Sequence, residues 1–439
     1  MKLAWYTPYS RRSAIALFSK EVVSSLLELG HEVTIIRSEA AHSDSMKTSR
    51  ERVCEVVTAE SIDSNVTDYL SGFDCVLYNI GNHLGNHYYC LPHQAQVPGI
   101  TVLHDYILHN LLIEWLQQHN NESYLDKLNA EAGKDAVQTY HAASDDLSRK
   151  WFMSRCADFP VLRFAMKSTL GVITHAKFYA SMCSSRLHCP VTTIPLAFCV
   201  ENERKLELPK FKHLPMRLIT IGDANVNKRF ESVIQAIGES KDLSSTWQYR
   251  IVGGISKSYE ELLTKLASGG RYPVDLVILG KVDDSALHQE LENSHAIACL
   301  RYPIIEGASA SAIVSLASAR PTLVSGGGCY GEIPDECIYR VQHSHEFGDI
   351  QKQLAAISTD YGRATAKAQA ARSWAVERHS GRQYVNLLLP FIDKVAKASP
   401  CLQLADTIST YLSNWKVSPQ LPLIDRIDAE STTLFGELF

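Results

Sequence analysis

Two basic residues, Lys228 and Arg229, stand where a strand, a loop and a helix could together hold an anion. They follow the apolar segment Arg217–Ile221 and a short loop, and the helical pattern Phe230–Ile237 begins directly after them. A helix N-terminus presents free backbone N–H groups and partial positive charge, so it favours a negatively charged ligand. Because basic side chains oppose the helix dipole there, a purely structural role is less favourable. We expect a phosphate site, and a solvated basic pair is the alternative.

An acidic residue with small neighbours follows a later apolar segment. Glu306 comes after Ala296–Leu300, and the small residues Gly307 to Ser311 open the next helical pattern. Small side chains let a ligand approach the backbone N–H groups of a helix start. The alternative role for Glu306 is to complement the dipole of that helix.

Polar residues also follow two apolar segments in the first part of the chain. His104 and Asp105 come directly after Gly99–Leu103, within the sequence VLHDYILH that also contains His109. A neutral imidazole can donate or accept one hydrogen bond with a substrate hydroxyl. A lone histidine after a buried strand is more often structural, but this context favours a functional residue. A comparable turn after another strand contains Asn79, Gly81 and Asn82.

Two other motifs lack the context that their chemistry needs. Gly326, Gly328 and Gly331 match GxGxxG, yet EIPDE follows them in place of a helix, so we expect a turn and not a dinucleotide site. His83 and His87 have HxxxH spacing without the glutamate of HExxH and without a third ligand nearby. We therefore expect no metal ion and no bound cofactor.

The segments that must position these residues repeat one pattern of strands and helices. In the first half, strands are predicted at Lys2–Tyr6, Val33–Ile36, Cys75–Asn79, Gly99–Leu103 and Leu170–Thr174, with a helix at Ile15–Leu29. In the second half, strands are predicted at Arg217–Ile221, Tyr249–Val252, Asp275–Leu279, Ala296–Leu300 and Thr322–Val324. Such alternation specifies a parallel, doubly wound sheet. Its repetition predicts an α/β protein with two Rossmann-like domains that face a cleft.

The domain boundaries follow from this repeat. We expect an N-terminal domain over residues 1–205 with a helical insertion at about 105–170, and a second Rossmann-like domain over 206–378. The charged, proline-containing segment 199–215 is the expected linker. Residues 379–439 are predicted to form a C-terminal helix and tail that pack back on the first domain.

Composition and charge exclude several classes of protein. The chain has 439 residues, of which 45% are hydrophobic and 21% are charged, as in folded globular proteins. Its formal net charge of −5 provides no basic field for nucleic acid. The eleven cysteines contain no CxxC pair, which is typical of free thiols in a reducing compartment. No segment resembles a signal peptide or a membrane span, so we expect a cytoplasmic protein.

The ordered set of motifs resembles the retaining GT-B glycosyltransferases of family four, the glycogen synthase-like and lipopolysaccharide glycosyltransferase-like enzymes, over roughly residues 1–395. The segments that carry the resemblance are GHEVTII, the turn 79–82, LHDYILH, FPVLRFAMKSTLGVITH, IPLAF, IGDANVNKRFESVIQAI and ACLRYPIIEGASASAIVSLASARPTLVS. The resemblance implies transfer of a sugar from a nucleotide sugar to a hydroxyl of a glycan or lipid-linked saccharide, with retention. Bacterial surface polysaccharide synthesis is the implied setting.

In such an enzyme each candidate residue has an implied role. Lys228 and Arg229 would stabilise the charge that the leaving diphosphate gains, while Glu306 and His104 would orient the donor sugar. The other implied donor contacts are Ser13, Ala14, Gly222, Val282, Gly307, Ala308 and Ser309. The implied acceptor contacts are Asn79, Gly81, Asn82 and Asp105. The departing phosphate oxygen would take the acceptor proton, so no dedicated protein base is required.

Two positions depart from the family pattern and keep other functions open. Val314 stands where the family has a second glutamate that binds the nucleotide ribose, and Ser13–Ala14 replaces two glycines beside the diphosphate. One alternative is a non-catalytic homologue that acts as a partner or scaffold, with the C-terminal tail docking on another protein. A nucleotide-sugar epimerase on the same architecture is another alternative.

The segment Arg149–Lys167 interleaves five basic residues with four aromatic ones. Such a pattern could dock on the anionic inner face of a membrane that presents a lipid-linked acceptor. A helical pair that packs its aromatic residues inward and extends its basic side chains into water is the more favoured alternative.

Overall fold

The computed structural model describes residues 1–11, 13–41, 43, 51–119, 123–142, 155–198 and 215–415. These residues form two compact units. Unit 1 contains the described residues before 198 and those from 381 onward, and unit 2 contains Phe198 and residues 215–380. Three predicted segments lie outside the described residues: nearly all of the linker, residues 149–154 of the basic and aromatic segment, and the tail after 415.

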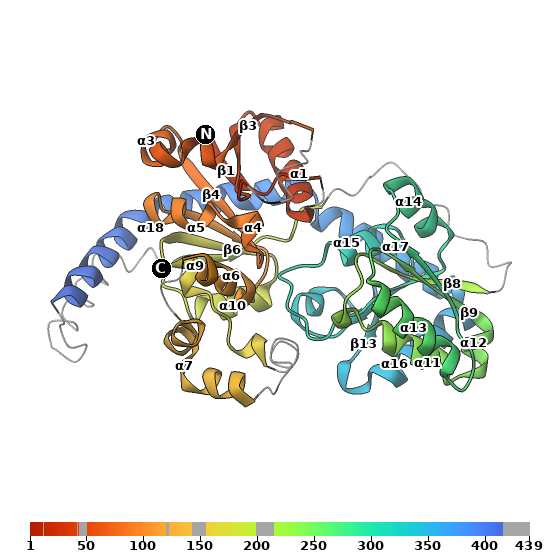
Figure 1. The fold of residues 1–439 in the computed structure, drawn as a ribbon. Coiled ribbons are helices and arrows are strands. Elements are labelled where there is room, and N and C mark those ends of the chain that lie inside the picture. The colour runs from red at the N-terminus through yellow and green to blue at the C-terminus, as the bar shows by residue number, and fades with distance from the viewer. Residues whose placement is uncertain are drawn as a thin grey trace. The chain divides into compact units, whose positions relative to one another are not determined.

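Unit 1 is built on a sheet of seven strands whose neighbours pair in parallel (Figure 1). Its order is β3-β2-β1-β4-β5-β6-β7. Consecutive residues are buried along β1, β2, β4 and β5, because both faces of a parallel sheet are covered. The strands are β1 Lys2–Thr7, β2 Glu32–Arg37, β3 Glu55–Thr58, β4 Cys75–Ile80, β5 Gly99–Leu103, β6 Thr169–Thr174 and β7 Val191–Thr193.

The helices of unit 1 connect these strands, and α6, α7 and α9 lie between β5 and β6. The helices before the insertion are α1 Ala14–Glu28, α2 Ala59–Ile62, α3 Val66–Leu70, α4 Leu84–His87 and α5 Cys90–Gln96. The later helices are α6 His109–His119, α7 Tyr124–Ala142, α9 Arg163–Met166 and α10 Lys177–Ser184.

Unit 2 is built on a second parallel sheet, with six strands in the order β10-β9-β8-β11-β12-β13. The strands are β8 Met216–Ile221, β9 Trp247–Val252, β10 Asp275–Gly280, β11 Ala296–Cys299, β12 Thr322–Ser325 and β13 Tyr339–Val341. Two parallel sheets of the Rossmann-like kind confirm the fold class predicted from the sequence.

The helices of unit 2 pack an apolar core against this sheet, with Phe230, Trp247 and Tyr249 fully buried at its centre. The helices are α11 Phe230–Gly238, α12 Lys241–Thr246, α13 Lys257–Gly269, α14 Asp284–Asn293, α15 Ala310–Ala317, α16 Glu346–Thr359 and α17 Tyr361–Arg378.

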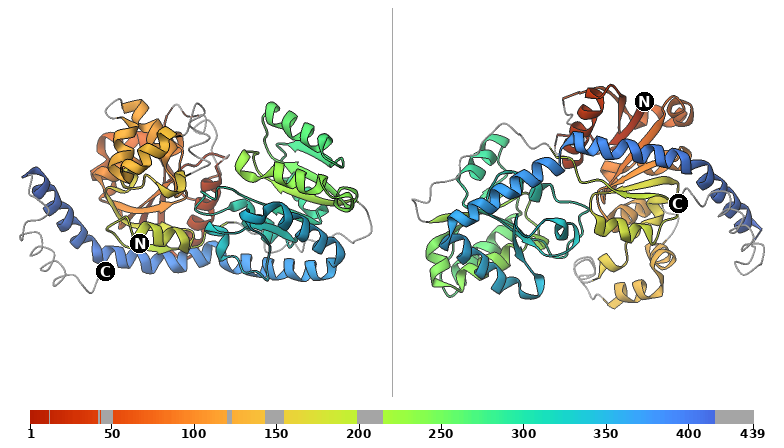
Figure 2. Two further views of the ribbon diagram at one scale, coloured as in Figure 1. Left: turned by 90° about the horizontal axis from the view of Figure 1, so that it is seen from below. Right: turned by 180° about the vertical axis from the view of Figure 1, so that it is seen from behind.

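The 34-residue helix α18, Gly381–Asn414, returns the chain to unit 1. Figures 1 and 2 show it as the long blue helix beside α1. The close approach requires Gly381, because a Cβ there would lie 2.5 Å from Ser25 Oγ. Farther along α18, Val395 packs on Gly171 of β6. Neither α18 nor any other helix in the described ranges is long and apolar enough to cross a membrane.

Candidate functional site

The carboxyl ends of the strands in unit 2 bring several predicted donor residues to one edge of its sheet. All strands of a parallel sheet end at the same edge, where such sheets commonly bind ligands. Gly222 directly follows β8, and Lys228 lies in the same loop before α11. Glu306 lies in the loop after the neighbouring strand β11.

Lys228 is buried, with 6% of its surface exposed. Its Nζ donates a hydrogen bond of 3.0 Å to the carbonyl oxygen of Ile221. A Cβ on Gly222 would lie 2.7 Å from this Nζ, and Gly222 has a φ of 90°, so both space and backbone conformation favour glycine there. Burial, and then the positive charge of Arg301, lower the pKa of Lys228 to about 8. A bound anion would favour the charged lysine.

Arg229 binds a different partner from that of Lys228. It directly precedes α11 in the left-handed conformation, with a φ of 60°. Its Nε donates to Oε1 of Glu346 at 2.9 Å, and its Nη2 donates to Oε2 at 2.6 Å. Ser232 Oγ donates to the same carboxylate at 2.8 Å. The structure therefore divides the basic pair, since Lys228 is buried at the strand ends while Arg229 is held by the first residue of α16.

Arg301, which no motif singled out, binds Glu306. Its Nε donates to Oε1 of Glu306 at 2.7 Å, and its Nη2 donates to Oγ of Ser311 at 3.2 Å. The arginine is 6% exposed, whereas 23% of the Glu306 side chain is exposed. The sequence signal that could have found it is a single cation at the end of an apolar segment, in IACLRYP.

Two buried polar atoms close to these charges have no hydrogen-bond partner among the described residues: Oδ1 of Asn227 and the hydroxyl of Tyr330. Asn227 directly precedes Lys228. Burial, with a further contribution from the charge of Glu306, raises the pKa of Tyr330 well above its ordinary value, so its hydroxyl is a neutral donor. Because buried polar atoms are nearly always paired in proteins, these two are suited to contacts with a polar ligand.

The predicted small residues Gly307, Ala308 and Ser309 directly precede α15, as expected from the sequence. Ser309 caps the helix, since its Oγ accepts a hydrogen bond of 3.3 Å from the N–H of Ala312. The loop that contains Glu306 therefore leads directly into α15.

Val282 and Val314 both pack against a single apolar cluster at the β8, β9 and β11 strands. The buried members of the cluster are Ile219, Ile221, Val252, Leu291 and Ile297. Val314, which stands where the family pattern has a glutamate, is thus part of an apolar contact.

In unit 1, His104 follows β5 and is oriented by Asn79 at the end of the neighbouring strand β4. The Nε2 atom of His104 lies 2.9 Å from Oδ1 of Asn79, and Nδ2 of Asn79 donates to the carbonyl of Tyr6 at 2.7 Å. Because this places the accepting oxygen of the amide toward the imidazole, His104 carries its proton on Nε2. Burial, and then the neighbouring imidazoles of His175 and His87, lower the pKa of His104 well below its ordinary value. The ring is neutral, and its Nδ1 can accept a hydrogen bond.

The turn after β4 lies beside His104 and is tied to the next loop. Oδ2 of Asp105 accepts a hydrogen bond of 2.8 Å from the N–H of Asn82. Oδ1 of Asn82 in turn accepts one of 3.1 Å from the N–H of Leu111, which anchors the start of α6. A Cβ on Gly81 would lie 3.0 Å from Oδ2 of Asp105. The predicted acceptor residues therefore lie together at the carboxyl edge of the unit 1 sheet.

A second histidine, not predicted from the sequence, lies beside His104. His175 follows β6 as His104 follows β5, and their ring centroids are 5.0 Å apart. Nδ1 of His175 donates to the carbonyl of Ile194 at 2.9 Å, and its buried Nε2 has no partner in the described part of the chain. Burial lowers the pKa of His175 to about 4. The segment GVITH repeats the strand-end histidine of TVLH, which is the signal that could have found it.

The remaining predicted residues of unit 1 have structural contacts. Oγ of Ser13 caps α1 by accepting a hydrogen bond of 3.3 Å from Ala16, and Ala14 is the first residue of that helix. His109 begins α6, and its Nδ1 lies 2.9 Å from the hydroxyl of Tyr124.

The residues of the HxxxH and GxGxxG motifs have structural positions in the fold. His87 is buried and its Nδ1 donates to the carbonyl of Asn79 at 2.8 Å. Gly326 follows β12, and Gly328 and Gly331 lie in a short 3-10 helix. Over the described ranges, no group of three or more His, Cys, Asp or Glu side chains could hold a metal ion.

Comparison with known proteins supports the fold through structure alone. No protein-family model and no curated protein sequence matches the chain. Sucrose-phosphate synthase from Thermosynechococcus elongatus superposes with a TM-score of 0.61 at 13% identity, over 91% of this chain and 100% of that one. A glycosyltransferase from Rickettsia africae has a TM-score of 0.61 at 13% identity, over 90% and 98%. The chain has the GT-B fold.

A further GT-B neighbour, Anabaena HepE in complex with UDP, has a TM-score of 0.59 at 11% identity, over 90% of this chain and 100% of that one. The agreement extends over nine tenths of this chain, so it includes both parallel sheets. A GT-B fold by itself does not assign a reaction, and the function must be argued from the residues at the strand ends.

Proposed function

We propose that this chain is a retaining glycosyltransferase that moves a sugar from a nucleoside diphosphate sugar to a hydroxyl group. The observation that carries the proposal is the buried Lys228, whose pKa is lowered to about 8, at the carboxyl edge of the unit 2 sheet. The nearby Arg301 is already bound to Glu306. A diphosphate would supply the negative charge that favours a fully protonated Lys228.

In the proposed reaction, Lys228 stabilises the negative charge that the diphosphate gains as its bond to the anomeric carbon breaks. The N–H groups of Gly307 to Ser309, at the start of α15, provide further donors to the phosphates. Glu306 accepts hydrogen bonds from hydroxyls of the donor sugar, while Arg301 fixes its orientation. A phosphate contact to Arg229 requires that the phosphate displace Glu346 from the guanidinium.

We also propose that His104, in unit 1, is a substrate-binding residue of this transferase. Its neutral ring, with the proton fixed on Nε2 by Asn79, leaves Nδ1 to accept a hydrogen bond from a sugar hydroxyl. The acceptor oxygen attacks the anomeric carbon on the face from which the diphosphate leaves. The departing phosphate oxygen takes the acceptor proton, so one C–O bond breaks, one forms, and charge is conserved.

The proposed acceptor is a glycan or a lipid-linked saccharide of a bacterial surface polysaccharide. Support comes from WaaG, a glycosyltransferase involved in lipopolysaccharide biosynthesis, which superposes with a TM-score of 0.52 at 14% identity over 85% of this chain and 94% of that one. HepE has been solved with UDP and with UDP-glucose. Uridine nucleotides are therefore the first donors to test.

The proposal is tested by titrating the protein with UDP, GDP and ADP in a calorimeter, and then with the corresponding sugar nucleotides. A donor that binds is incubated with saccharide acceptors, and the anomeric configuration of the product is read by NMR. Absence of binding by every nucleotide, together with no difference between the unchanged protein and Lys228→Ala, would reject a transferase.

The apolar contact of Val314 favours one alternative, a non-catalytic homologue that serves as a partner or scaffold. Such a protein would bind no sugar nucleotide tightly and would give no product. A nucleotide-sugar epimerase would instead convert the donor in the absence of any acceptor, which the same NMR measurement detects.

A further inference from the structure

A pocket of about 510 Å³ in unit 1 lies at the amino-terminal edge of the sheet. Pro98, Thr169 and Cys189 line it, and they stand at or just before the first residues of the neighbouring strands β5, β6 and β7. His104 and His175 follow the other ends of β5 and β6. The pocket is thus separated from the candidate site by the length of the strands.

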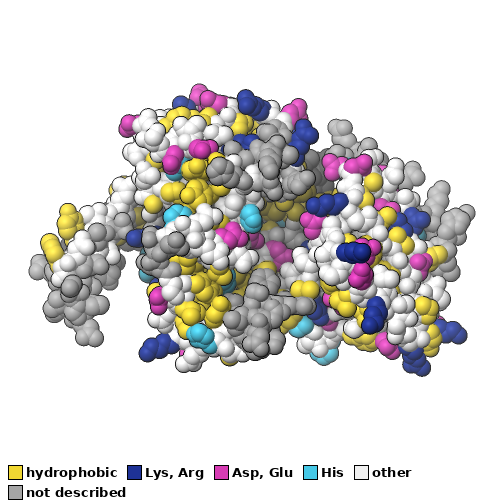
Figure 3. All heavy atoms as spheres, viewed as in Figure 1, with side chains coloured by type: hydrophobic (Ala, Val, Ile, Leu, Met, Phe, Trp, Pro, Cys, Tyr) yellow, Lys and Arg dark blue, Asp and Glu magenta, His cyan; other side chains and the backbone are white. Residues whose placement is uncertain are grey.

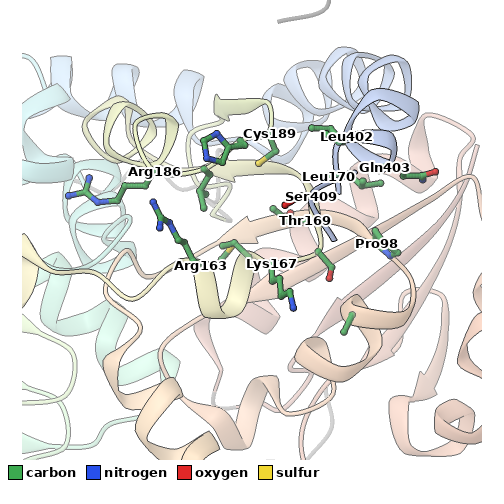
Figure 4. Close-up of a pocket in the computed structure, with 16 residues that line it drawn as sticks. Pro98, Arg163, Lys167, Thr169, Leu170, Arg186, Cys189, Leu402, Gln403 and Ser409 are labelled. Atoms are coloured by element: carbon green, nitrogen blue, oxygen red, sulfur yellow. The ribbon is translucent and has the colours of Figure 1, made fainter. Parts of the chain in front are cut away.

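Three basic side chains line this pocket: Arg163 and Lys167 from α9 and its end, and Arg186 after α10 (Figure 4). The described residues that line it include no aspartate or glutamate. Glu131 accepts hydrogen bonds from the backbone N–H groups of Arg163 and Phe164, and Arg186 Nη1 donates to the carbonyl of Met182 at 3.1 Å. The first contact uses a backbone N–H of Arg163 and the second uses a carbonyl acceptor for Arg186, so neither is an ion pair.

The charge of the pocket contrasts with the net charge of the chain and with the face shown in Figure 3. The whole chain has a formal net charge of −5, and basic and acidic side chains are interspersed on the face shown in Figure 3. The Glu131 carboxylate attracts Arg163 but does not line the pocket, so the grouped cations still raise the local concentration of anions there. Arginine pairs especially well with phosphate, because its N–H groups match two phosphate oxygens.

The α18 side of the pocket combines the apolar Leu402 and Ala405 with the polar Gln403 and Ser409. Leu402, on α18, lies across the pocket from Arg163 in Figure 4, and Leu170 and Leu187 also line it. Along the last turns of the same helix and just beyond it, Leu404, Tyr411 and Trp415 are 42%, 56% and 70% exposed. Exposed tyrosine and tryptophan side chains are typical of surfaces that meet lipid headgroups.

We propose that this pocket binds an amphiphile with a phosphate group, the phosphate contacting Arg163, Lys167 and Arg186 and the apolar part lying against Leu402. The phosphate belongs either to a dissolved organic phosphate or to the headgroup of a lipid in a membrane surface. This binding is independent of the proposed sugar transfer, since the pocket shares no residue with the candidate site.

The described part of the basic and aromatic segment, residues 155–167, agrees with this proposal. Arg155 pairs with Asp158 at 2.9 Å and its guanidinium lies over the ring of Phe159, so this arginine already has local partners. Arg163 and Lys167 are exposed and belong to the pocket. Among the described cations of this segment, Arg155 is therefore in a local ion pair, while Arg163 and Lys167 line the pocket.

The test measures binding of ethyl phosphate, octyl phosphate below its micelle concentration and inorganic phosphate to the full chain by calorimetry. We expect octyl phosphate to bind most tightly, with each methylene that packs against Leu402 adding up to about fourfold in affinity. The variant Arg163→Gln/Lys167→Gln should lose about tenfold in affinity, because two exposed charges are removed. The variant Leu402→Asn should bind ethyl phosphate normally and lose the dependence on chain length.

The matched control is Lys134→Gln/Lys394→Gln, which removes two exposed charges from the same unit without altering the pocket. It should bind octyl phosphate as the unchanged protein does. Both double variants should keep the thermal unfolding midpoint and the UDP affinity of the unchanged protein.

The source of the phosphate is resolved by co-sedimentation with vesicles of phosphatidylcholine, with and without phosphatidylglycerol. Binding to the anionic vesicles that is lost in Arg163→Gln/Lys167→Gln supports the pocket and identifies a lipid headgroup. Binding of octyl phosphate without vesicle binding supports the pocket and identifies a dissolved amphiphile. Equal octyl phosphate binding by the protein and this variant, equal affinity for ethyl and octyl phosphate, or equal loss in the control variant would overturn the proposal.

Discussion

Arg301 donates a hydrogen bond of 2.7 Å from its Nε to Oε1 of Glu306, so the acidic residue that sequence patterns single out is held by a cation that they pass over. Oε2 of Glu306 also accepts a hydrogen bond of 3.1 Å from the N–H of Ile305. The carboxylate is therefore fixed in position before any ligand arrives. Its negative charge also favours the protonated form of Lys228.

Replacing Glu306 should separate nucleotide binding from turnover. In Glu306→Gln the repulsion between this carboxylate and a diphosphate is removed, so UDP should bind equally well or more tightly. The sugar loses its charged hydrogen-bond acceptor, and kcat should fall about a hundredfold. Glu290→Gln is the matched control, because Glu290 also accepts from an arginine at 2.7 Å in the same unit. A fall in UDP affinity with unchanged kcat would contradict the assigned role.

Removing the buried lysine should weaken nucleotide binding directly. Lys228→Ala is expected to lower UDP affinity by about tenfold to a hundredfold, because a charge-assisted hydrogen bond to phosphate is lost. Calorimetry measures the change, with Lys265→Ala on the exposed face of α13 as the control. Equal affinities in the three proteins would show that the diphosphate does not contact Lys228.

The lowered pKa of Lys228 predicts how UDP binding depends on pH. The lysine loses its proton as the pH rises through about 8, so UDP affinity should fall by about tenfold between pH 7 and pH 9. Binding near pH 8 should also take up a proton, because the phosphate raises the pKa of the lysine. Titrations in two buffers of different ionisation enthalpy measure the uptake, and Lys228→Ala should abolish it. A constant affinity over this range would contradict the prediction.

Gly222 should tolerate no side chain. In Gly222→Ala the φ of 90° is strained and the new Cβ would lie 2.7 Å from Nζ of Lys228. We expect a loss of about 1–3 kcal/mol in the free energy of unfolding of unit 2, together with weaker UDP binding. Gly348→Ala is the control in the same unit, since nothing lies within 4 Å of its Cβ position and its φ is not positive. Thermal unfolding and calorimetry should separate the two variants.

Buried neutral histidines should make unit 1 sensitive to acid. The pKa of His175 is about 4 and that of His87 is about 3 in the folded protein, both below the value in an unfolded chain. The unfolded state therefore binds more protons below about pH 6.5, and stability should fall as the pH is lowered toward 4, by up to about 1.4 kcal/mol per pH unit for each histidine.

This acid sensitivity is measured as the unfolding midpoint against pH. His175→Leu, which removes one such group, should show a shallower decline than the unchanged protein. A decline of equal slope in both proteins would assign the acid sensitivity to other groups.

The fold was largely predictable because its central strands are unbroken apolar segments. The three strands missed from the sequence, β3, β7 and β13, are three or four residues long and occupy edges of the two sheets. An edge strand is covered less completely, so its sequence need not be uniformly apolar. EVVT and VTT, for example, mix polar and apolar residues.

The site was less predictable, because its side chains depend on partners that are remote in sequence. Arg229 reads as half of a phosphate-binding pair, but its carboxylate partner Glu346 lies 117 residues later, at the start of α16. His104 likewise depends on Asn79, and the amide of Asn79 depends on the carbonyl of Tyr6 in a third strand. A local pattern identifies the strand end at which a residue stands, but not the group that its side chain meets.

Because α18 completes unit 1 from a late part of the chain, the order in which the residues are synthesised affects how this unit folds. The sheet of unit 1 comes from residues before 198, whereas the helix that packs on α1 and β6 begins at Gly381. On the ribosome the first unit therefore emerges early but remains incomplete until the second has been made. The later unit, contiguous over residues 215–380 in its described part, can finish folding first, and a nascent chain that stops before α18 leaves the apolar faces of α1 and β6 uncovered for chaperones to bind.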